Sequence, residues 1–227
     1  MRFELMYESF FKIIDGIPLT LQVVSVSTIL GLGLAILVAL MRISGKKSLS
    51  IPAYYFVYLI RGTPLLLQLY FVYYGLGQFS SVRESILWPI LKEPYWCGII
   101  TLTISTGAYS SEIIRGGILS VSKNFVEASS ALGLNKFKTF LLITIPITVR
   151  QALPAYGNEL ILMVKASSLI SIITLMEITG IARTIISKTY APVEIFLVAG
   201  SIYLIINFTI VLAVGYAEKK LGTIKAN

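Results

Sequence analysis

The sequence predicts an all-α integral membrane protein with five transmembrane helices. Of its 227 residues, 56% are hydrophobic and only 13% are charged, about half the charged fraction of a soluble globular domain. Five apolar stretches are long enough to cross a bilayer, which takes about 20 residues. The basic residues gather at the ends of these stretches and form no single patch, so the formal charge of +8 does not indicate nucleic-acid binding. One transmembrane domain, residues 1–227, holds the whole chain.

The first span is expected over about residues 17–41, a run without any charged residue. Gly31 and Gly33 within it favour close packing against a neighbouring helix. The run is too long for the apolar region of a signal peptide and lacks a small-residue cleavage site. We therefore expect it to be retained.

The second span, about residues 51–76, is interrupted by Arg61-Gly62-Thr63-Pro64. Proline lacks a backbone donor and disfavours helical backbone at the residue before it. The sequence therefore predicts a kink or a new helix start at Thr63–Pro64. A loop over residues 75–93 follows.

Three more spans are expected at about residues 94–114, 152–175 and 193–216. Two of them contain polar groups that are costly at membrane depth: Glu112 in the third span, and Asn158, Glu159 and Lys165 in the fourth. A polar connection over residues 177–192 joins the last two spans.

The distribution of basic residues predicts the orientation. With the N-terminus outside, the cytoplasmic side carries Arg42, Lys46, Lys47, Arg115, Lys123, Lys136, Lys138, Arg150, Lys219, Lys220 and Lys225. The outer side carries Arg2, Lys12, Arg83, Lys92, Arg183 and Lys188, with Arg61 and Lys165 left inside the membrane. Because basic residues prefer the cytoplasmic side, we expect the N-terminus outside and the C-terminus in the cytoplasm.

The longest central stretch that does not resemble a span is residues 122–146, on the cytoplasmic side of this topology. Asn124 is placed to cap a helix with Glu127 as its third residue, as in a capping box. One face of that helix would carry Phe125, Ala128, Ser129 and Leu132. Small residues on this face would let the backbone of a partner approach closely.

This central stretch also contains a predicted helix break. Gly133 is placed as a helix-ending glycine, and Asn135 is placed to cap a second helix that runs toward Pro146. From these features alone, an amphipathic loop lying on the membrane surface is the favoured interpretation.

The spacing of this stretch resembles the EAA loop of ABC importer permeases. Glu127-Ala128-Ser129 is followed after three residues by Gly133, and after nine more by Ile143-Thr144-Ile145-Pro146. Ser129 and Ile145 replace the Ala and Leu of the family pattern, and both exchanges keep the geometry. In that family the loop forms coupling helices that dock into a groove on a cytoplasmic ATPase. The resemblance implies that role for Asn124, Glu127, Ala128, Ser129, Leu132, Gly133 and Pro146.

Three further segments resemble polar amino acid permeases of the histidine/glutamine/arginine branch (HisM-like). They are Arg61-Gly62-Thr63-Pro64-Leu65-Leu66-Leu67-Gln68, the Gly107–Gly116 segment and the Leu153–Leu169 segment. Together the matches cover roughly residues 15–220 and imply the type I ABC importer permease fold. Asn124 stands where the family has a glycine, which puts the start of the coupling helix in question.

The resemblance implies several partners in the bacterial inner (cytoplasmic) membrane. They are two ATP-binding subunits, a second identical or homologous permease, an extracytoplasmic substrate-binding protein and an amino acid substrate. The chain itself lacks a P-loop, because Gly45-Lys46 has neither the upstream glycine nor a following hydroxyl residue. We expect no enzyme activity and no cofactor in this chain, with ATP and Mg²⁺ in the partner. With no histidine and only Cys97, we also expect no metal site.

The polar residues within the spans suggest a substrate path or gate made of Arg61, Pro64, Asn158, Glu159, Lys165 and Ser167. Glu159 either meets a cationic substrate group or pairs with Arg61 or Lys165 inside the bundle. Lys165, on a different face from Glu159, either binds a substrate carboxylate, pairs with an acidic residue or caps carbonyls. Asn158 either binds substrate or joins two helices.

Two other charges have alternative roles. Glu112 and Arg115, one turn apart, are interpreted as a structural pair that orients the coupling stretch, with gating as the alternative. Arg61 either snorkels at the kink or belongs to the gate.

The favoured function is a permease subunit of an ATP-driven importer for polar, and most simply basic, amino acids. The alternative is an ion-coupled secondary transporter or channel that uses Glu159 and Lys165 as an ion relay. Such folds often contain inverted repeats, but the Arg61–Pro64 interruption has no second copy here. A membrane scaffold without transport activity would leave the charges within the spans unexplained. Co-purification with an ATPase separates the importer from both alternatives.

Overall fold

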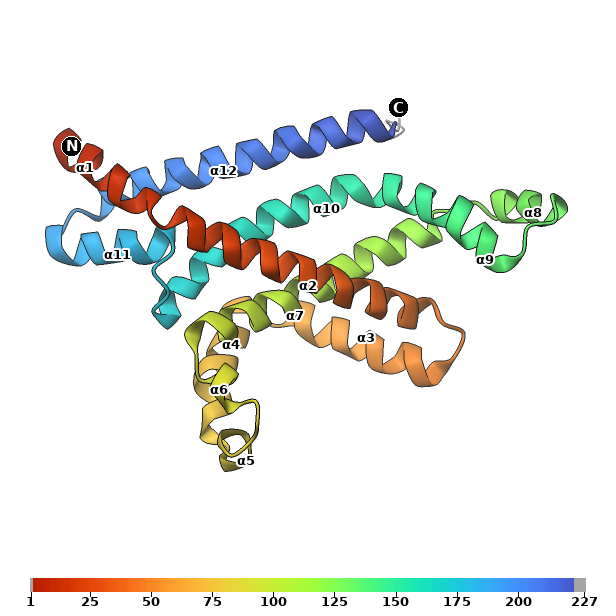
Figure 1. Cartoon of the computed structure of the whole chain (residues 1–227), viewed down its shortest axis with the longest axis horizontal. Helices are drawn as coiled ribbons and strands as arrows, with labels where there is room; N and C mark the ends of the chain where they lie inside the picture. The colour runs from red at the N-terminus through yellow and green to blue at the C-terminus, as the bar shows by residue number, and fades with distance from the viewer. Residues whose placement is uncertain (1, 223–227) are drawn as a thin grey trace.

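The computed structural model describes residues 2–222, which form helices joined by short loops. Four long helices run along the length of the molecule (Figure 1): α2 (Ile17–Ile43), α7 (Pro94–Leu119), α10 (Ile145–Ser167) and α12 (Pro192–Leu221). No β-strand occurs within the described residues. The prediction of an all-α fold is confirmed.

Shorter helices complete the chain. They are α1 (Phe3–Ile14), α3 (Lys47–Gly62), α4 (Leu65–Tyr70), α5 (Ser80–Arg83), α6 (Trp88–Leu91), α8 (Lys123–Ala131), α9 (Lys136–Thr139) and α11 (Ile178–Thr189). The π-helical turns are η1 (Phe71–Gly75) and η3 (Phe140–Thr144), and the 3₁₀ turns are η2 (Leu76–Gln78) and η4 (Ser168–Ile173).

Three helical segments in the described chain are long and apolar enough to cross a bilayer: α2, the run Lys136–Ile173, and α12. A fourth candidate is the bent pair Lys47–Gly62 and Leu65–Gln78. These four correspond to the first, fourth, fifth and second predicted spans. Helix α7, the third predicted span, is not among them, although its 26 residues correspond to about 39 Å.

The composition of α7 follows from its central position. It packs against α2, α3, α4 and α10, and its buried residues include Ser105, Thr106, Gly107, Ala108, Ser110 and Ser111. A helix surrounded by other helices needs little apolar surface toward lipid, and small residues let its neighbours approach closely.

Glycines mark the closest approach of α2 and α7. A Cβ added at Gly31 would overlap the Thr106 side chain, and one at Gly107 would meet Leu34 at 2.6 Å. The packing role predicted for Gly31 is therefore confirmed. For Gly33 it is wrong, because an added Cβ there meets nothing within 4 Å.

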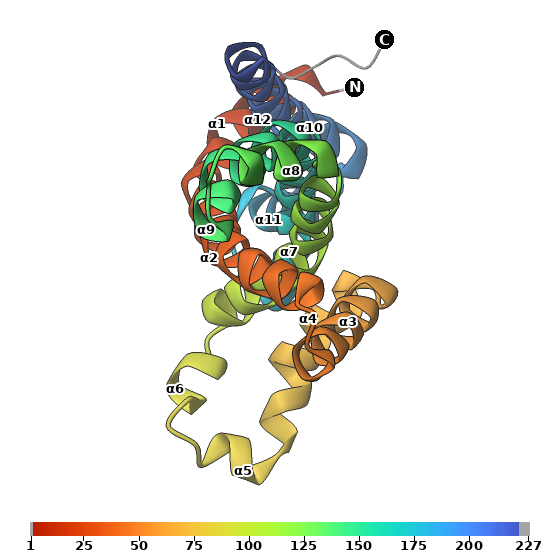
Figure 2. The ribbon, with the colours of Figure 1, turned by 90° about the vertical axis from the view of Figure 1, so that its right-hand side faces the viewer.

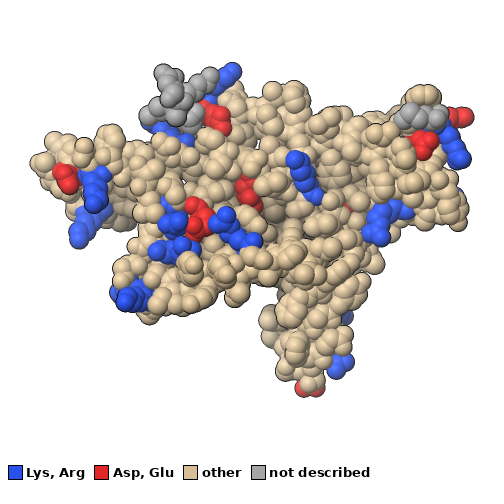
Figure 3. Space-filling model, turned by 180° about the vertical axis from the view of Figure 1, so that it is seen from behind, with Lys and Arg blue, Asp and Glu red and all other residues tan. Residues whose placement is uncertain are grey.

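The predicted break in the second span is confirmed. Thr63 and Pro64 both have extended backbone conformations, with ψ angles of 143° and 132°. The two helical halves meet at 104°, so the chain leaves the bundle sideways. Helices α5 and α6 form a lobe that stands apart from the long helices (Figure 2), whereas Leu69 of α4 and Val72 of η1 are buried in the core. On the face seen in Figure 3, the charged side chains of the lobe lie at and near its tip.

The fourth predicted span differs from the structure at its start. Helical structure begins at Lys136 and continues to Ile173, so Pro146 does not separate the second coupling helix from the span. Pro146 lies in the first turn of α10, directly after the π-turn η3. A wide π-turn accommodates the missing N–H and the bulk of the proline ring.

Helices α1 and α11, which the sequence did not predict, pack at the end of the bundle opposite α8 and α9 (Figure 1). Ile13, Ile178 and Ile195 are fully buried between α1, α11 and α12. An apolar cluster therefore holds the N-terminal helix against the connection between the last two spans.

Candidate functional site

Helix α8 opens the predicted coupling stretch, but its N-cap differs from the prediction. The cap is Ser122, whose hydroxyl accepts the N–H of Asn124 at 3.3 Å. Ser122 has the extended backbone that an N-cap requires, whereas Asn124 already lies in the first turn. The capping box of Asn124 and Glu127 is therefore wrong, and Glu127 is exposed.

Gly133 ends this helix as predicted. Its φ angle is +77°, in the left-handed region that suits glycine. Its N–H donates to the carbonyl of Ser130, and the N–H of Leu134 donates to the carbonyl of Ser129, both at 3.0 Å. This hydrogen-bond pair is a Schellman motif. Asn135 then caps α9, accepting the N–H of Lys138 at 2.9 Å, as predicted.

The face of α8 is divided between an internal contact and an exposed surface. Ser129 is 3% exposed, and its Oγ lies 2.9 Å from Oγ1 of Thr139 on α9. Ser129 therefore joins the two short helices and is not available to a partner. Phe125, Leu132 and Phe137 remain 56%, 82% and 71% exposed. Large apolar side chains grouped on a surface indicate a surface that binds a partner.

This exposed tip lies at one end of the molecule. The turn between α2 and α3 and the C-terminal end of α12 lie toward the same end, whereas α1 and α11 lie at the other (Figure 1). Thus the segments that carry most of the predicted cytoplasmic basic residues are on the same side as α8 and α9.

Glu159 of α10 is buried, at 7% exposure, against α7. Its Oε1 accepts a hydrogen bond from Oγ1 of Thr106 at 3.0 Å. Among the described residues no direct ion pair joins it to Arg61 or Lys165, although the charge of Arg61 acts on it from a greater distance. The carboxylate of Glu159 is therefore held in the bundle by one hydrogen bond, with no cation in direct contact.

The other polar residues of α10 point in different directions. Lys165 is exposed and makes no ion pair within residues 2–222, whereas Ser167 is fully buried and donates to the carbonyl of Val164 at 2.8 Å. Helix α10 changes to 3₁₀ geometry at Ser168, where the sequence suggested a loosened helix. Asn158 is exposed, and no hydrogen bond joins it to another helix in the described chain.

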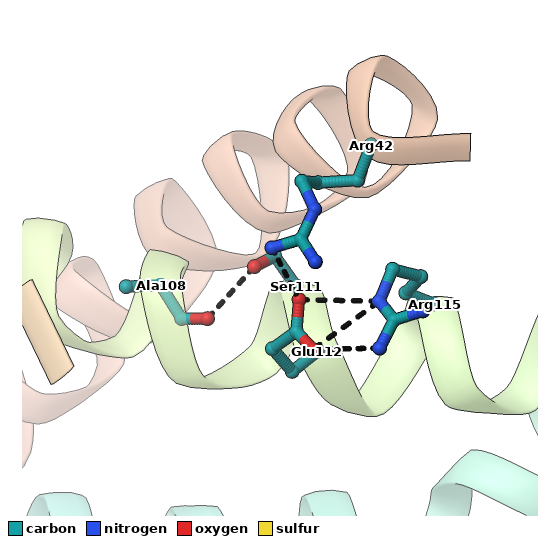
Figure 4. A network of polar contacts seen from close by, with 5 residues as sticks. All are labelled: Arg42, Ala108, Ser111, Glu112 and Arg115. Carbon is teal, nitrogen blue, oxygen red and sulfur yellow. Dashed lines mark hydrogen bonds and ion pairs between the residues drawn. The ribbon is translucent and has the colours of Figure 1, made fainter. Parts of the chain in front are cut away.

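Glu112 is the centre of a network that the sequence predicted only in part (Figure 4). The predicted pair is confirmed, with Arg115 Nη2 2.9 Å from Glu112 Oε2. A second guanidinium, that of Arg42 on α2, lies 2.9 Å from Oε1 of the same carboxylate and over the ring of Tyr54. Glu112 therefore joins the C-terminal end of α2 to α7.

Arg61 lies beside the break in the second span. Its guanidinium stacks on the ring of Tyr109, 5.1 Å from the centroid. The break itself is held by Gln68, whose amide nitrogen donates to the carbonyl of Ile60 at 2.7 Å and to that of Thr63 at 3.1 Å. Gln68 thus satisfies carbonyls that the missing proline N–H leaves open, a role that its position four residues after Pro64 could have suggested.

A second buried carboxylate, Glu177, lies in the connection between the last two spans. It caps α11 by accepting the N–H of Gly180 at 2.8 Å, and it accepts the hydroxyl of Tyr203 on α12 at 2.6 Å. Burial raises the pKa of Glu177, and these two hydrogen bonds oppose that effect. The sequence offers a signal for the cap, since Glu177 directly precedes α11, but none for its contact with Tyr203.

A comparison with known protein families identifies the family to which this structure belongs. The family described as binding-protein-dependent transport system inner membrane component matches residues 31–223. The chain belongs to this family. It is 50% identical over 205 residues to the octopine transport system permease protein OccM of Rhizobium radiobacter, which covers 90% of this chain and 84% of OccM. It is 48% identical to the nopaline transport system permease protein NocM of Agrobacterium fabrum, covering 96% and 91%.

A solved structure shares this architecture. A chain in the crystal structure of an amino acid ABC transporter with histidines matches with a TM-score of 0.86 and 31% identity, over 97% of this permease and 99% of that chain. The protein is therefore the permease subunit of an amino acid ABC importer, a multi-pass protein of the bacterial inner membrane. Permeases of this family are not catalytic; a separate ATPase hydrolyses ATP, and the family implies a substrate-binding protein. The ion-relay alternative is set aside.

Proposed function

We propose that this permease imports polar, cationic amino acids or their derivatives by alternating access. Two permeases, identical or homologous, would line one path, and two ATPase subunits would bind ATP and Mg²⁺ below them. An extracytoplasmic protein would deliver the substrate. ATP binding and hydrolysis would rock the spans between outward-open and inward-open states. The octopine and nopaline permeases named above, at 50% and 48% identity, support a polar substrate derived from an amino acid.

The proposed topology has five spans, with the N-terminus outside and the C-terminus in the cytoplasm. Helix α7 serves as the third span, because its neighbours cover much of its surface. The excess of basic residues on the cytoplasmic side supports this topology. So does the position of α8 and α9 at the end of the molecule where the C-terminal end of α12 lies (Figure 1).

We assign coupling to the exposed tip formed by α8 and α9. The observation that carries this assignment is the Schellman motif that ends α8 at Gly133. It leaves Phe125 and Leu132 exposed on a short helix outside the bundle. Asn124, Glu127 and Ala128 belong to α8 in this tip, and Ser129 supports it from inside. Pro146 lies in the first turn of α10, where the coupling segment continues into the span.

The proposed path and gate comprise Arg61, Pro64, Asn158, Glu159, Lys165 and Ser167. Glu159 supports the preference for cations, because a buried carboxylate at membrane depth is costly without a positive partner. Pro64 provides the bend that moves the chain aside. Ser167 lies where α10 loosens into 3₁₀ geometry.

Uptake into liposomes tests the proposal. The permease, its ATPase and its binding protein would be reconstituted with ATP inside the vesicles. We expect ATP-dependent uptake of radiolabelled arginine, histidine or octopine, and much slower uptake of glutamate. Uptake that persists without ATP, or that favours glutamate, contradicts the proposal.

A further inference from the structure

A pocket of about 350 Å³ lies between the inner end of α2, helix α3 and helix α7. Helix α3 contributes Tyr54, Tyr58 and Arg61, which follow one another at helical spacing and so form a single column. Helix α7 contributes Tyr109 and Glu112, one turn apart on the opposite wall. The pocket therefore combines aromatic rings with charged groups.

The charged groups of this pocket differ in how they are paired. The carboxylate of Glu112 is already shared by Arg42 and Arg115, each at 2.9 Å. Among residues 2–222, no carboxylate lies within ion-pair distance of Arg61. Arg61 is held instead by the face of Tyr109, which orients a guanidinium and leaves its edge N–H groups free to donate. The pocket thus offers one positioned guanidinium that makes no direct ion pair, with the carboxylates of Glu112 and Glu159 acting on it only from a distance.

The depth of Arg61 narrows the choice of anion. Arg61 follows the first residue of α3, Lys47, by fourteen residues, which is a rise of about 21 Å. With Lys47 at the inner interface, as in the proposed topology, Arg61 lies within a hydrocarbon core about 30 Å thick, in a pocket that extends to Arg42 at the inner end of α2. A phospholipid phosphate stays at the interface, whereas a transported molecule must pass this depth.

We propose that Arg61 binds the carboxylate of the transported amino acid in this pocket. The inference rests on the proposed import function and adds a subsite for the end of the substrate opposite its cationic side chain. The guanidinium presents two parallel N–H groups that match a carboxylate, and Tyr109 fixes the plane of that fork. Tyr54 and Tyr58, stacked with their centroids 6.2 Å apart, form an apolar wall for the substrate stem.

Pairs of ligands that differ only in the carboxylate test this assignment. Binding would be measured with arginine and agmatine, and with histidine and histamine, on the permease–ATPase complex in nanodiscs without the binding protein. The variants are Arg61→Gln and Arg61→Lys, with Arg83→Gln as the matched control, because Arg83 is exposed on the lobe. Nanodiscs with and without anionic lipid separate a lipid phosphate from the substrate carboxylate.

We expect the wild-type complex to bind the amino acid about tenfold or more tightly than its decarboxylated analogue, the effect of one charge-assisted contact. Arg61→Gln should reduce this ratio to about one, with amine binding changed less than about twofold. Arg61→Lys keeps the charge but loses the fork, so it should reduce the ratio by about threefold. Arg83→Gln should leave the ratio at its wild-type value.

Four results overturn the assignment. They are an unchanged ratio in Arg61→Gln, equal weakening of both ligands, a change only in bound phospholipid, and no binding of either amino acid by the wild type. Uptake by the wild-type complex distinguishes failure of the Arg61 subsite from failure of the proposed import function. If the import function is wrong, the wild-type complex takes up no amino acid, whereas failure of this subsite alone leaves uptake intact.

Discussion

The amide of Gln68 donates to the carbonyl of Ile60 at 2.7 Å across the Thr63–Pro64 break. The bond joins α4 to the last turn of α3, so it holds the two halves at their angle of 104°. The proline break removes the N–H that would donate to the Ile60 carbonyl, and the part-buried bond from Gln68 replaces it, a contribution of about 1 kcal/mol. Gln68 therefore stabilises the bend that brings Arg61 beside Tyr109.

Gln68→Leu should destabilise the protein by about 1 kcal/mol, because it keeps side-chain size but removes the donor. The measurement is thermal unfolding of the detergent-solubilised permease. Gln78→Leu is the matched control, since Gln78 makes only one exposed contact, at 3.3 Å, with the carbonyl of Tyr74. Equal losses in the two variants contradict a special role for Gln68.

The guanidinium groups of Arg42 and Arg115, which both contact Glu112, should contribute differently to stability. Arg42→Gln removes a contact between α2 and α7. The Arg42 and Glu112 side chains are only 13% and 19% exposed, so we expect the free energy of unfolding to fall by about 2–3 kcal/mol. Arg115→Gln removes a contact within one helix from a side chain 29% exposed, and should cost about 0.5 kcal/mol. Unfolding in the same detergent compares them, and a greater loss in Arg115→Gln is the contrary result.

Glu159→Gln should reduce uptake of cationic substrates about tenfold or more, as expected for the loss of one charge-assisted contact. The glutamine side chain still accepts from Thr106, so the fold should be kept. Glu84→Gln is the control for the lost charge, because Glu84 is exposed on the lobe. Uptake in proteoliposomes is the measurement, and wild-type uptake in Glu159→Gln removes the main support for a preference for cations.

Gly133→Val should leave the permease folded in the membrane but weaken its association with the ATPase. A branched side chain disfavours the left-handed backbone of Gly133 by about 1–2 kcal/mol, so the end of α8 should shift. Gly45→Val is the control, because Gly45 also has open space around it but no left-handed φ angle. Co-purification of the ATPase measures the effect, and normal transport in Gly133→Val contradicts the coupling assignment.

Features that depend on neighbouring residues were predictable from the sequence. The break at Thr63–Pro64 follows from proline chemistry, the stop at Gly133 from backbone freedom, and the Glu112–Arg115 pair from helical spacing. The family motifs added the role of the coupling loop, which local chemistry alone could not distinguish from a surface helix. The N-cap was misplaced because Ser122 and Asn124 are both good caps and differ only in backbone conformation.

Contacts between distant segments were not predictable. Thr106 and Glu159 are 53 residues apart, and no local pattern links Arg42 to Glu112 or Glu177 to Tyr203. Gly31 and Gly33 also could not be told apart from the sequence, because both are glycines in the same apolar run. Only the position of α7 distinguishes them. Pro146 was read as a boundary because a π-turn, which accommodates it, has no clear sequence signature.

The central claim is that the loop formed by α8 and α9 couples this permease to an ATPase. ATPase activity of the purified complex in lipid tests it most directly, with Glu127→Lys compared with Glu84→Lys, the same change of charge on the exposed lobe. We predict that the ATPase binds the wild type, and that hydrolysis falls sharply in Glu127→Lys but stays near wild type in Glu84→Lys. Hydrolysis that is unchanged by Glu127→Lys, or an ATPase that does not associate with the wild-type permease, would contradict the claim.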